Sequence, residues 1–206
     1  MKTKLSKKRA ISTVLTTVII LVSSVVLGSG VVLYGTSLFQ SGTQTEAITI
    51  SSPKVWVHTT ASEGLAWGAA GVRNTGDKVV SVDKIQIRGA NIPFTQWYPD
   101  TDVSATLYQQ ALNHSGWATP GGLYNDATCS PVTTLQIDLG ATDDFCANAA
   151  TGPIALNPGQ SAIIYFKLTN GTLTSLDSGV NTSVNIFAGK AGAPQSVTVE
   201  GKSYTP

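Results

Sequence analysis

An uncharged stretch of 36 residues, from Ala10 to Thr45, is the feature of this 206-residue chain that most limits its fold. As an α-helix it would be about 54 Å long, whereas about 20 residues are enough to cross the hydrocarbon core of a bilayer. The apolar part of a secretory signal peptide is shorter still, about 7 to 15 residues. The length therefore predicts an apolar helix that stays in the finished protein.

The composition of this stretch limits where it can be helical. Between Ile11 and Val32, 13 of the 22 residues are β-branched, and in water such a composition favours strands. Where water is excluded, the backbone must satisfy its own hydrogen bonds, and a helix does so. We therefore expect the segment to be helical when it is surrounded by lipid or by copies of itself.

Small and hydroxylated residues recur along the stretch at steps of three and four, close to the helical period. On a helix they form one stripe, which lets a second helix approach closely, as small residues do at helix interfaces in membranes. We predict that this stripe packs the helix in a filament core. The alternative is a plain anchor that its glycines merely bend. The stripe consists of Thr13, Thr17, Ser24, Gly28 and Gly35, filled in by Ile20 and Val31.

Positive charge is concentrated before the apolar stretch. Of 13 basic residues, five lie in the first nine positions, which leaves 8 basic against 12 acidic residues and a net charge of −4 for the rest. Because phosphate binding needs clustered Lys and Arg, no nucleic-acid partner is expected. A basic flank instead holds the N-terminus in the cytoplasm. The five residues are Lys2, Lys4, Lys7, Lys8 and Arg9.

The junction between the basic flank and the apolar stretch reads Arg9-Ala10-Ile11-Ser12. In this pattern the sequence resembles the precursors of archaeal type IV pilins and archaellins, which carry a class III signal peptide. The resemblance implies that a prepilin peptidase cuts after Ala10 and leaves Ile11 as the new N-terminus. It also implies that the subunit lies in the cytoplasmic membrane until the pilus or archaellum assembly machinery bundles its helix with others.

Two positions bear on the kind of subunit. Bacterial pilins carry Glu at the fifth mature position, where this chain has Leu15, as is usual in the archaeal branch. Archaellins commonly have Gly near the third mature position, where this chain has Thr13, so a pilin is favoured over an archaellin. A conventional signal peptidase cut after Gly28 is the alternative processing, and it would release a secreted domain.

From Ile48 onward, apolar and polar residues alternate with period two, as in β-strands. In a regular strand, Val80 and Val82 would lie on the opposite face to Ile85 and Ile87. We therefore expect a bulge near Asp83 and Lys84, which would bring all four to one face. Seven or eight short strands separated by turns predict an antiparallel sandwich. The expected strands are centred on residues 48–57, 65–72, 79–87, 135–139, 164–168, 184–188 and 197–199.

Two strand pairs, at residues 72–87 and 156–168, also resemble those of archaeal pilin and archaellin head domains, which are immunoglobulin-like sandwiches. The predicted fold class is therefore α+β: a long hydrophobic N-terminal helix followed by an antiparallel immunoglobulin-like β-sandwich head domain. The predicted organisation is a cleaved leader at 1–10, the helix and a hinge at 11–45, and the head domain at 46–206.

The region from about Phe94 to Ala149 lacks clear periodicity, and we interpret it as a long excursion exposed on the outer surface. A disulfide between Cys129 and Cys146 would close an 18-residue loop and contribute about 3 kcal/mol. Two free buried thiols are the alternative. Three aromatic residues of the region are candidates for an adhesive patch, although a core role is favoured: Trp97, Tyr98 and Trp117.

Three N-x-Ser/Thr sequons begin at Asn113, Asn170 and Asn181. This motif is an acceptor for N-glycosylation in proteins exposed outside the cytoplasm. The sequons and the disulfide agree with an extracellular location. We therefore expect glycans on the outer surface of the domain.

Motifs for catalysis or cofactor binding are absent from the sequence. His58 and His114 have no second ligand at helical spacing, no nucleophile motif frames any serine, and the Gly-rich run at 64–71 lacks the lysine of a phosphate-binding loop. Four acidic residues are candidate calcium ligands, but solvated loops explain them more simply: Asp100, Asp102, Asp143 and Asp144. We expect no enzyme, no cofactor and no metal site.

Together these features predict the structural subunit of an archaeal type IV pilus-like surface filament, a homopolymer held by its N-terminal helix and used for attachment. The precursor is expected in the cytoplasmic membrane. An archaellin, the filament subunit of the archaeal swimming organelle, is the first alternative. The second is a membrane-anchored extracellular binding module that does not polymerise.

Overall fold

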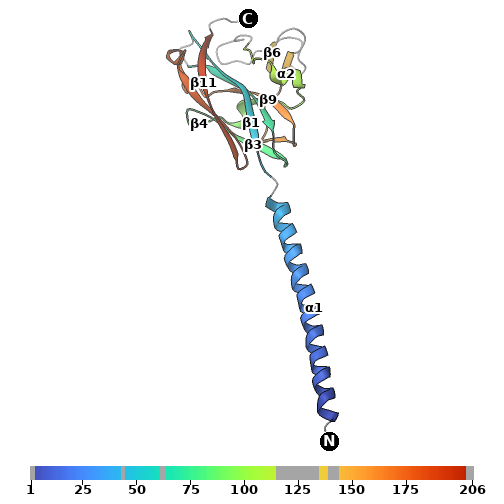
Figure 1. Ribbon diagram of the computed structural model, residues 1–206. Coiled ribbons are helices and arrows are strands. Elements are labelled where there is room, and N and C mark those ends of the chain that lie inside the picture. Colours follow the sequence, from blue (N-terminus) through green and yellow to red (C-terminus); the bar gives the residue numbers. More distant parts are fainter. Residues whose placement is uncertain (1–2, 43–44, 61–63, 115–134, 139–143, 203–206) are drawn as a thin grey trace. The chain divides into compact units, whose positions relative to one another are not determined.

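The computed structural model describes residues 3–42, 45–60, 64–114, 135–138 and 144–202 (Figure 1). The chain divides into two compact units, Met1–Gln44 and Thr45–Pro206, and we call the second unit the β domain. The fold class is α+β, an apolar N-terminal helix followed by a mostly β domain, as the sequence predicts.

Helix α1 (Thr3–Gly42) makes up the first unit. Successive residues of an α-helix point about 100° apart, so the consecutive residues Ile19, Ile20, Leu21 and Val22 face all sides of the axis. Every large apolar side chain from Val14 to Phe39 is at least 50% exposed within the chain. A helix that is apolar all round belongs in a buried environment, and this chain alone does not provide one.

The described residues of the β domain form the strands β1 to β11, the short helix α2 and two 3-10 turns. Their bounds are β1 (Ile48–His58), β2 (Ala66–Asn74), β3 (Val80–Ile87), β4 (Ala90–Asn91), η1 (Phe94–Gln96), β5 (Trp97–Asp100), α2 (Ala105–Gln109), β6 (Leu135–Asp138), β7 (Asp144–Ala147), β8 (Ile154–Leu156), β9 (Ser161–Lys167), η2 (Ser175–Asp177), β10 (Asn181–Ala188) and β11 (Ala191–Lys202).

Most strands join in one curled sheet with the order β4-β3-β10-β11-β1-β2-β9-β5, with β8 beside β3 (Figure 1). Strand β11 makes the curl possible because it changes partner along its length. Its residues 191–198 pair with β10, and its residues 199–202 pair with β1 in parallel. Strands β6 and β7 form a separate hairpin.

The expected bulge in β3 is present. Lys84 pairs with Phe187, but the next pair is Val82 with Ala188, so Asp83 has no counterpart on β10. The bulge brings Val82 and Ile85 to the same face, and both are fully buried. A turn precedes β9, with Gln160 N donating to Asn157 O at 2.9 Å and a positive φ of +78° at Gly159.

Two apolar clusters lie on opposite faces of the strands β1, β2 and β9. The first cluster contains residues from strands near both ends of the curled sheet, β3 and β5, and includes Val55, Ile164 and Ile186. The second includes Trp56 and Tyr165, which alternate with the first set along the same strands. Because both faces of the sheet are covered here, all five consecutive residues of β9 from Ala162 to Phe166 are buried, and exposed polar residues do not alternate with them.

The second cluster corrects the interpretation of the region 94–149 as an exposed excursion. Its described parts pack onto the sheet: α2 contributes Leu107, the β6–β7 hairpin contributes Ile137 and Phe145, and β5 contributes Tyr98. Exposure was predicted because the segment lacks periodicity. Short pieces with one or two apolar residues each cover the sheet without forming a periodic pattern. Trp97 and Tyr98 are buried as core residues, whereas Trp117 lies outside the described residues.

Candidate assembly helix and other candidate sites

Within α1, the segment Ser12–Phe39 is long and apolar enough to cross a membrane. Its 28 residues correspond to about 42 Å, compared with about 30 Å for a hydrocarbon core. By length and composition alone, such a segment near the N-terminus serves equally as a membrane anchor or as a signal sequence. Its side chains and their bonding are therefore the informative features.

Five hydroxyl groups along α1 donate hydrogen bonds within the helix itself. Thr16 Oγ1 donates to Ser12 O at 2.8 Å, and Ser24 Oγ donates to Leu21 O at 2.8 Å. Thr17, Ser29 and Thr36 donate in the same way to carbonyls three residues earlier. Since these donors need no water, these five polar residues are compatible with lipid or with a dry helix bundle.

The stripe predicted from the sequence lies entirely within α1, so its residues share one side of a regular helix. A Cβ atom added at Gly28 or Gly35 would meet nothing within 4 Å in this chain. Nothing inside the chain therefore requires a glycine at either position. The stripe Thr13, Thr17, Ile20, Ser24, Gly28, Val31 and Gly35 remains a predicted packing face for another helix.

The predicted cleavage site also lies within α1. The backbone from Thr3 onward is helical and continues without a break through Arg9, Ala10 and Ile11. Cleavage after Ala10 would remove fewer than three helical turns and leave a helix of more than 30 residues. The span Ser12–Phe39 would be retained whole.

The predicted modification sites are described in part. Cys129 and the side chain of Cys146 lie outside the described residues, so the disulfide stays a prediction. The side chains of Asn113, Asn170 and Asn181 are all exposed. Asn170 lies in a turn where Thr172 N donates to Thr169 O at 3.0 Å, whereas Asn181 begins β10 and its Oδ1 accepts from Thr198 Oγ1 at 2.8 Å.

Both histidines are buried in the β domain. His114 packs against Trp56 with 5.4 Å between ring centroids, and the backbone N of Thr60 donates to His58 Nδ1 at 3.2 Å. Burial, together with the charges of Lys202 and His58, lowers the pKa of His114 to about 4. His114 is therefore neutral at pH 7 and serves as part of the core.

Among the described residues, no group of three or more His, Cys, Asp or Glu side chains is close enough to hold a metal ion. Of the candidate calcium ligands, Asp100 Oδ1 accepts from the backbone N of Asp102 at 2.9 Å, which is a local turn. Asp143 and the side chain of Asp144 lie outside the described residues.

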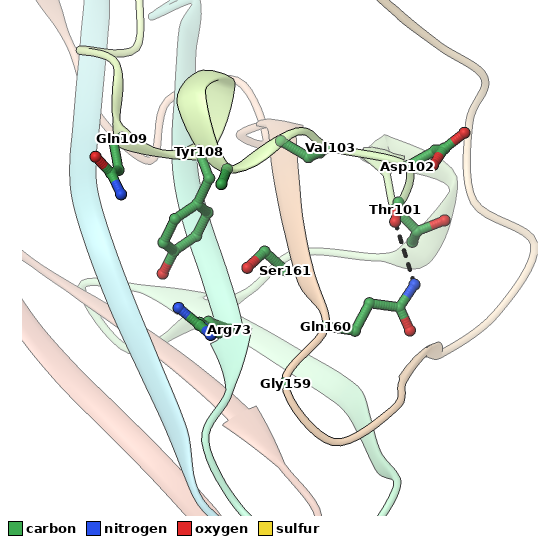
Figure 2. A pocket seen from close by; sticks show the side chains of 10 residues that line it. Arg73, Thr101, Asp102, Val103, Tyr108, Gln109, Gly159, Gln160 and Ser161 are labelled. Atoms are coloured by element: carbon green, nitrogen blue, oxygen red, sulfur yellow. Dashed lines mark hydrogen bonds between the residues drawn. The ribbon is translucent and has the colours of Figure 1, made fainter.

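The structure reveals a polar cavity that the sequence did not predict (Figure 2). It has a volume of about 370 Å³ and lies where the end of β2, the start of β9 and the segment 101–109 meet. Its lining residues come from three separate parts of the sequence, at 73, 101–109 and 159–161, and no periodic pattern links them. Only the strand pairing brings them together.

The sequence matches no protein-family model and no curated protein. The functional assignment must therefore be argued from the residues of this chain.

Proposed function

We propose that this chain is the structural subunit of an archaeal type IV pilus-like cell-surface filament, which polymerises through its N-terminal helix. The observation that carries the proposal is the 28-residue apolar segment Ser12–Phe39, exposed on all sides and placed directly after a basic flank. Its length exceeds that of a simple span, and five of its hydroxyls donate to carbonyls of the same helix. Both properties suit a helix that moves from a membrane into a dry bundle.

In this proposal the filament core is a bundle of α1 helices. Burial of about 1,500 Å² of apolar surface per helix, at about 25 cal/mol per Å², gives a large favourable term even after deductions for entropy and for the membrane reference state. The β domain, which we propose to be an immunoglobulin-like sandwich, is displayed outside and carries the glycans. Assembly, not catalysis, is the function.

Processing supplies the first test. A prepilin peptidase in the cytoplasmic membrane is proposed to cut between Ala10 and Ile11, and the mature chain is expected to begin at Ile11. Filaments sheared from cells should be analysed by N-terminal sequencing and intact mass. A mature chain that begins at Ser29 would refute the proposal, because cleavage there removes most of the helix and leaves a secreted domain.

The stripe supplies a second test with a matched control. Gly28 lies on the stripe, and Gly30 lies about 200° away on the opposite side of the helix. Neither position has an atom within 4 Å of an added Cβ, so leucine at either is tolerated within the chain. We expect Gly28→Leu to reduce filament yield strongly, because it separates the packed helices, and Gly30→Leu to reduce it much less.

The two variants should be compared for membrane insertion as well as for sheared filaments. Equal insertion with unequal filament yield supports packing along the stripe. Equal filament yield from both variants contradicts the stripe, and surface display without any filament contradicts polymerisation and favours the anchored binding module.

Deletion of the gene that encodes this chain distinguishes a pilus subunit from an archaellin. For a pilus subunit, we expect cells to lose surface attachment while their swimming is unchanged.

A further inference from the structure

The cavity between β2, β9 and the segment 101–109 has the features of a binding site for a small polar ligand. Its volume of about 370 Å³ falls within the range of about 300 to 1,000 Å³ that is usual for small-molecule sites. Its lining is dominated by polar side chains, among them Arg73, Tyr108, Gln109 and Ser161 (Figure 2).

Strand pairing determines which side chains form the floor of the cavity. Arg73 near the end of β2 pairs with Ser161 at the start of β9. Residues two apart on a strand share a face. Arg73 therefore lies on the same face of β2 as Trp67 and Ala69, and Ser161 lies on the same face of β9 as Ile163 and Tyr165. These four apolar and aromatic residues belong to the second apolar cluster. The covered face of the sheet thus changes from apolar to polar at this pair.

Tyr108 forms one wall, and its position depends on a glycine. A Cβ at Gly71 would lie 2.9 Å from Cε2 of Tyr108, so the ring lies directly over a residue without a side chain. The short helix α2 holds the tyrosine in place from the other direction: Tyr108 N donates to Ser104 O at 3.0 Å, and Ser104 Oγ caps Leu107 N at 3.2 Å.

The charges of the lining residues are separated. Within the described residues the ion pairs are Lys54 with Glu200 and Arg88 with Asp177, so the guanidinium of Arg73 has no carboxylate partner there. Asp102 lies toward the other end of the cavity, beyond Gln160, whose Nε2 donates to Thr101 O at 3.1 Å (Figure 2). One end is therefore cationic, and the other presents hydrogen-bond acceptors.

We propose that this cavity binds an acidic sugar residue, a pyranose ring that carries one carboxylate, as in a uronic acid. The planar guanidinium of Arg73 matches a carboxylate in a bidentate manner. The ring of Tyr108 offers a flat apolar surface with a polar tip for the C–H face of the sugar. Ser161 and Gln109 can bond to ring hydroxyls.

Asp102 contributes to selectivity in this arrangement. The side chain of Asp102 points away from the other lining side chains in Figure 2, but its negative charge at the far end of the cavity would still disfavour a second negative charge of the ligand. The cavity therefore favours a ligand with a single carboxylate placed at Arg73. Such binding does not depend on whether the chain polymerises, so a failure here leaves the filament proposal untouched.

The experiment uses the full chain in detergent micelles and three probes, with binding followed by calorimetry or ligand-observed NMR. Methyl glucuronide carries the ring and the carboxylate, methyl glucoside carries the ring alone, and acetate carries the carboxylate alone. We expect the glucuronide to bind with a dissociation constant of about 1 mM and the other two to bind at least about tenfold more weakly.

Variants assign the binding to Arg73. Arg73→Gln should weaken glucuronide binding at least about tenfold, whereas Arg73→Lys, which keeps the charge but loses the planar fork, should have an intermediate effect. Arg88→Gln is the matched control, because it removes the same charge from an exposed site outside the cavity, and its binding should match that of the unmodified chain. Thermal unfolding verifies that each variant is folded.

Four results would overturn the assignment. The first is the absence of glucuronide binding at about 10 mM ligand, and the second is equal binding of the glucuronide and the glucoside. The third is the same affinity in folded Arg73→Gln and Arg88→Gln. Acetate that binds as tightly as the glucuronide would reduce the site to a simple anion contact and would equally refute a sugar site.

Discussion

The hydroxyl of Tyr165 donates a 2.7 Å hydrogen bond to the backbone carbonyl of Asn113. Tyr165 is fully buried in β9, where its ring lies 4.6 Å from that of Phe145 and stacks on Trp56. Asn113 belongs to the segment that follows α2 and covers this face of the sheet. One hydrogen bond thus fixes the covering segment, and a sequon within it, to the centre of the β domain.

Tyr165→Phe is expected to destabilise the β domain by about 1 to 2 kcal/mol, because the substitution keeps the ring and leaves the carbonyl of Asn113 without its donor. Tyr98→Phe is the matched control: Tyr98 is also buried, and no hydrogen bond of its hydroxyl is present among the described residues, so a smaller loss is expected. Denaturant unfolding followed by tryptophan fluorescence measures both. Equal losses in the two variants would contradict the role of this hydrogen bond.

The stability of the β domain is expected to fall as the pH is lowered from about 6.5 to about 4. Burial lowers the pKa of His114 to about 4 in the folded state, with Lys202 and His58 acting in the same direction, whereas an unfolded histidine titrates near 6.5. The unfolded state therefore binds the proton first, so the contribution of neutral His114 is complete above pH 6.5 and is lost as the pH falls toward 4.

His114→Gln tests this assignment. The variant should be less stable than the unmodified chain at pH 7, because packing against Trp56 is altered, but its stability should depend less on pH between 6.5 and 4. Unfolding curves at several pH values supply the slopes. A variant slope as steep as that of the unmodified chain would show that other groups cause the pH dependence.

Gly76→Ala is expected to destabilise the β domain by about 2 kcal/mol or more. An added Cβ would lie 2.3 Å from Thr45 O and 2.8 Å from Ala47 N, and these backbone atoms cannot move aside easily. The turn also donates to the junction segment 45–47 through Thr75 N to Ala47 O at 3.0 Å and Asp77 N to Thr45 O at 3.1 Å. The substitution should therefore loosen the start of the domain.

Gly152→Ala provides the control for this prediction, because a Cβ there meets nothing within 4 Å. Its effect should remain within about 0.5 kcal/mol. Thermal unfolding of both variants, together with limited proteolysis near Thr45, gives the comparison. Similar unfolding temperatures and similar cleavage would indicate that the close contact at Gly76 is relieved at little cost.

Among the sequons, Asn170 is expected to be glycosylated more fully than Asn181. Asn170 lies in an exposed turn, the setting in which the acceptor motif is accessible. Asn181 begins β10, and the following Thr182 is buried between paired strands. Glycopeptide mass spectrometry of protein from the native host measures the occupancies, and the reverse order would contradict the structural argument.

The sequence predicted the strands best where one face alternates clearly. The bulge at Asp83 followed from the parity change between Val82 and Ile85, because side-chain alternation is a local property of a strand. The prediction of an exposed excursion at 94–149 was wrong for the parts of it that the structure describes. Its buried residues, such as Leu107 and Phe145, come from pieces too short to show a period.

Sequence alone determined that an apolar helix precedes a β domain, because length, the absence of charge and period-two alternation are properties of contiguous residues. Tertiary structure decided which faces of the sheet are covered. It also decided where the polar cavity lies, because Arg73 and Ser161 become neighbours only through the pairing of β2 with β9. Contacts between residues so far apart depend on strand order and register, and these are set by the packing of the whole domain.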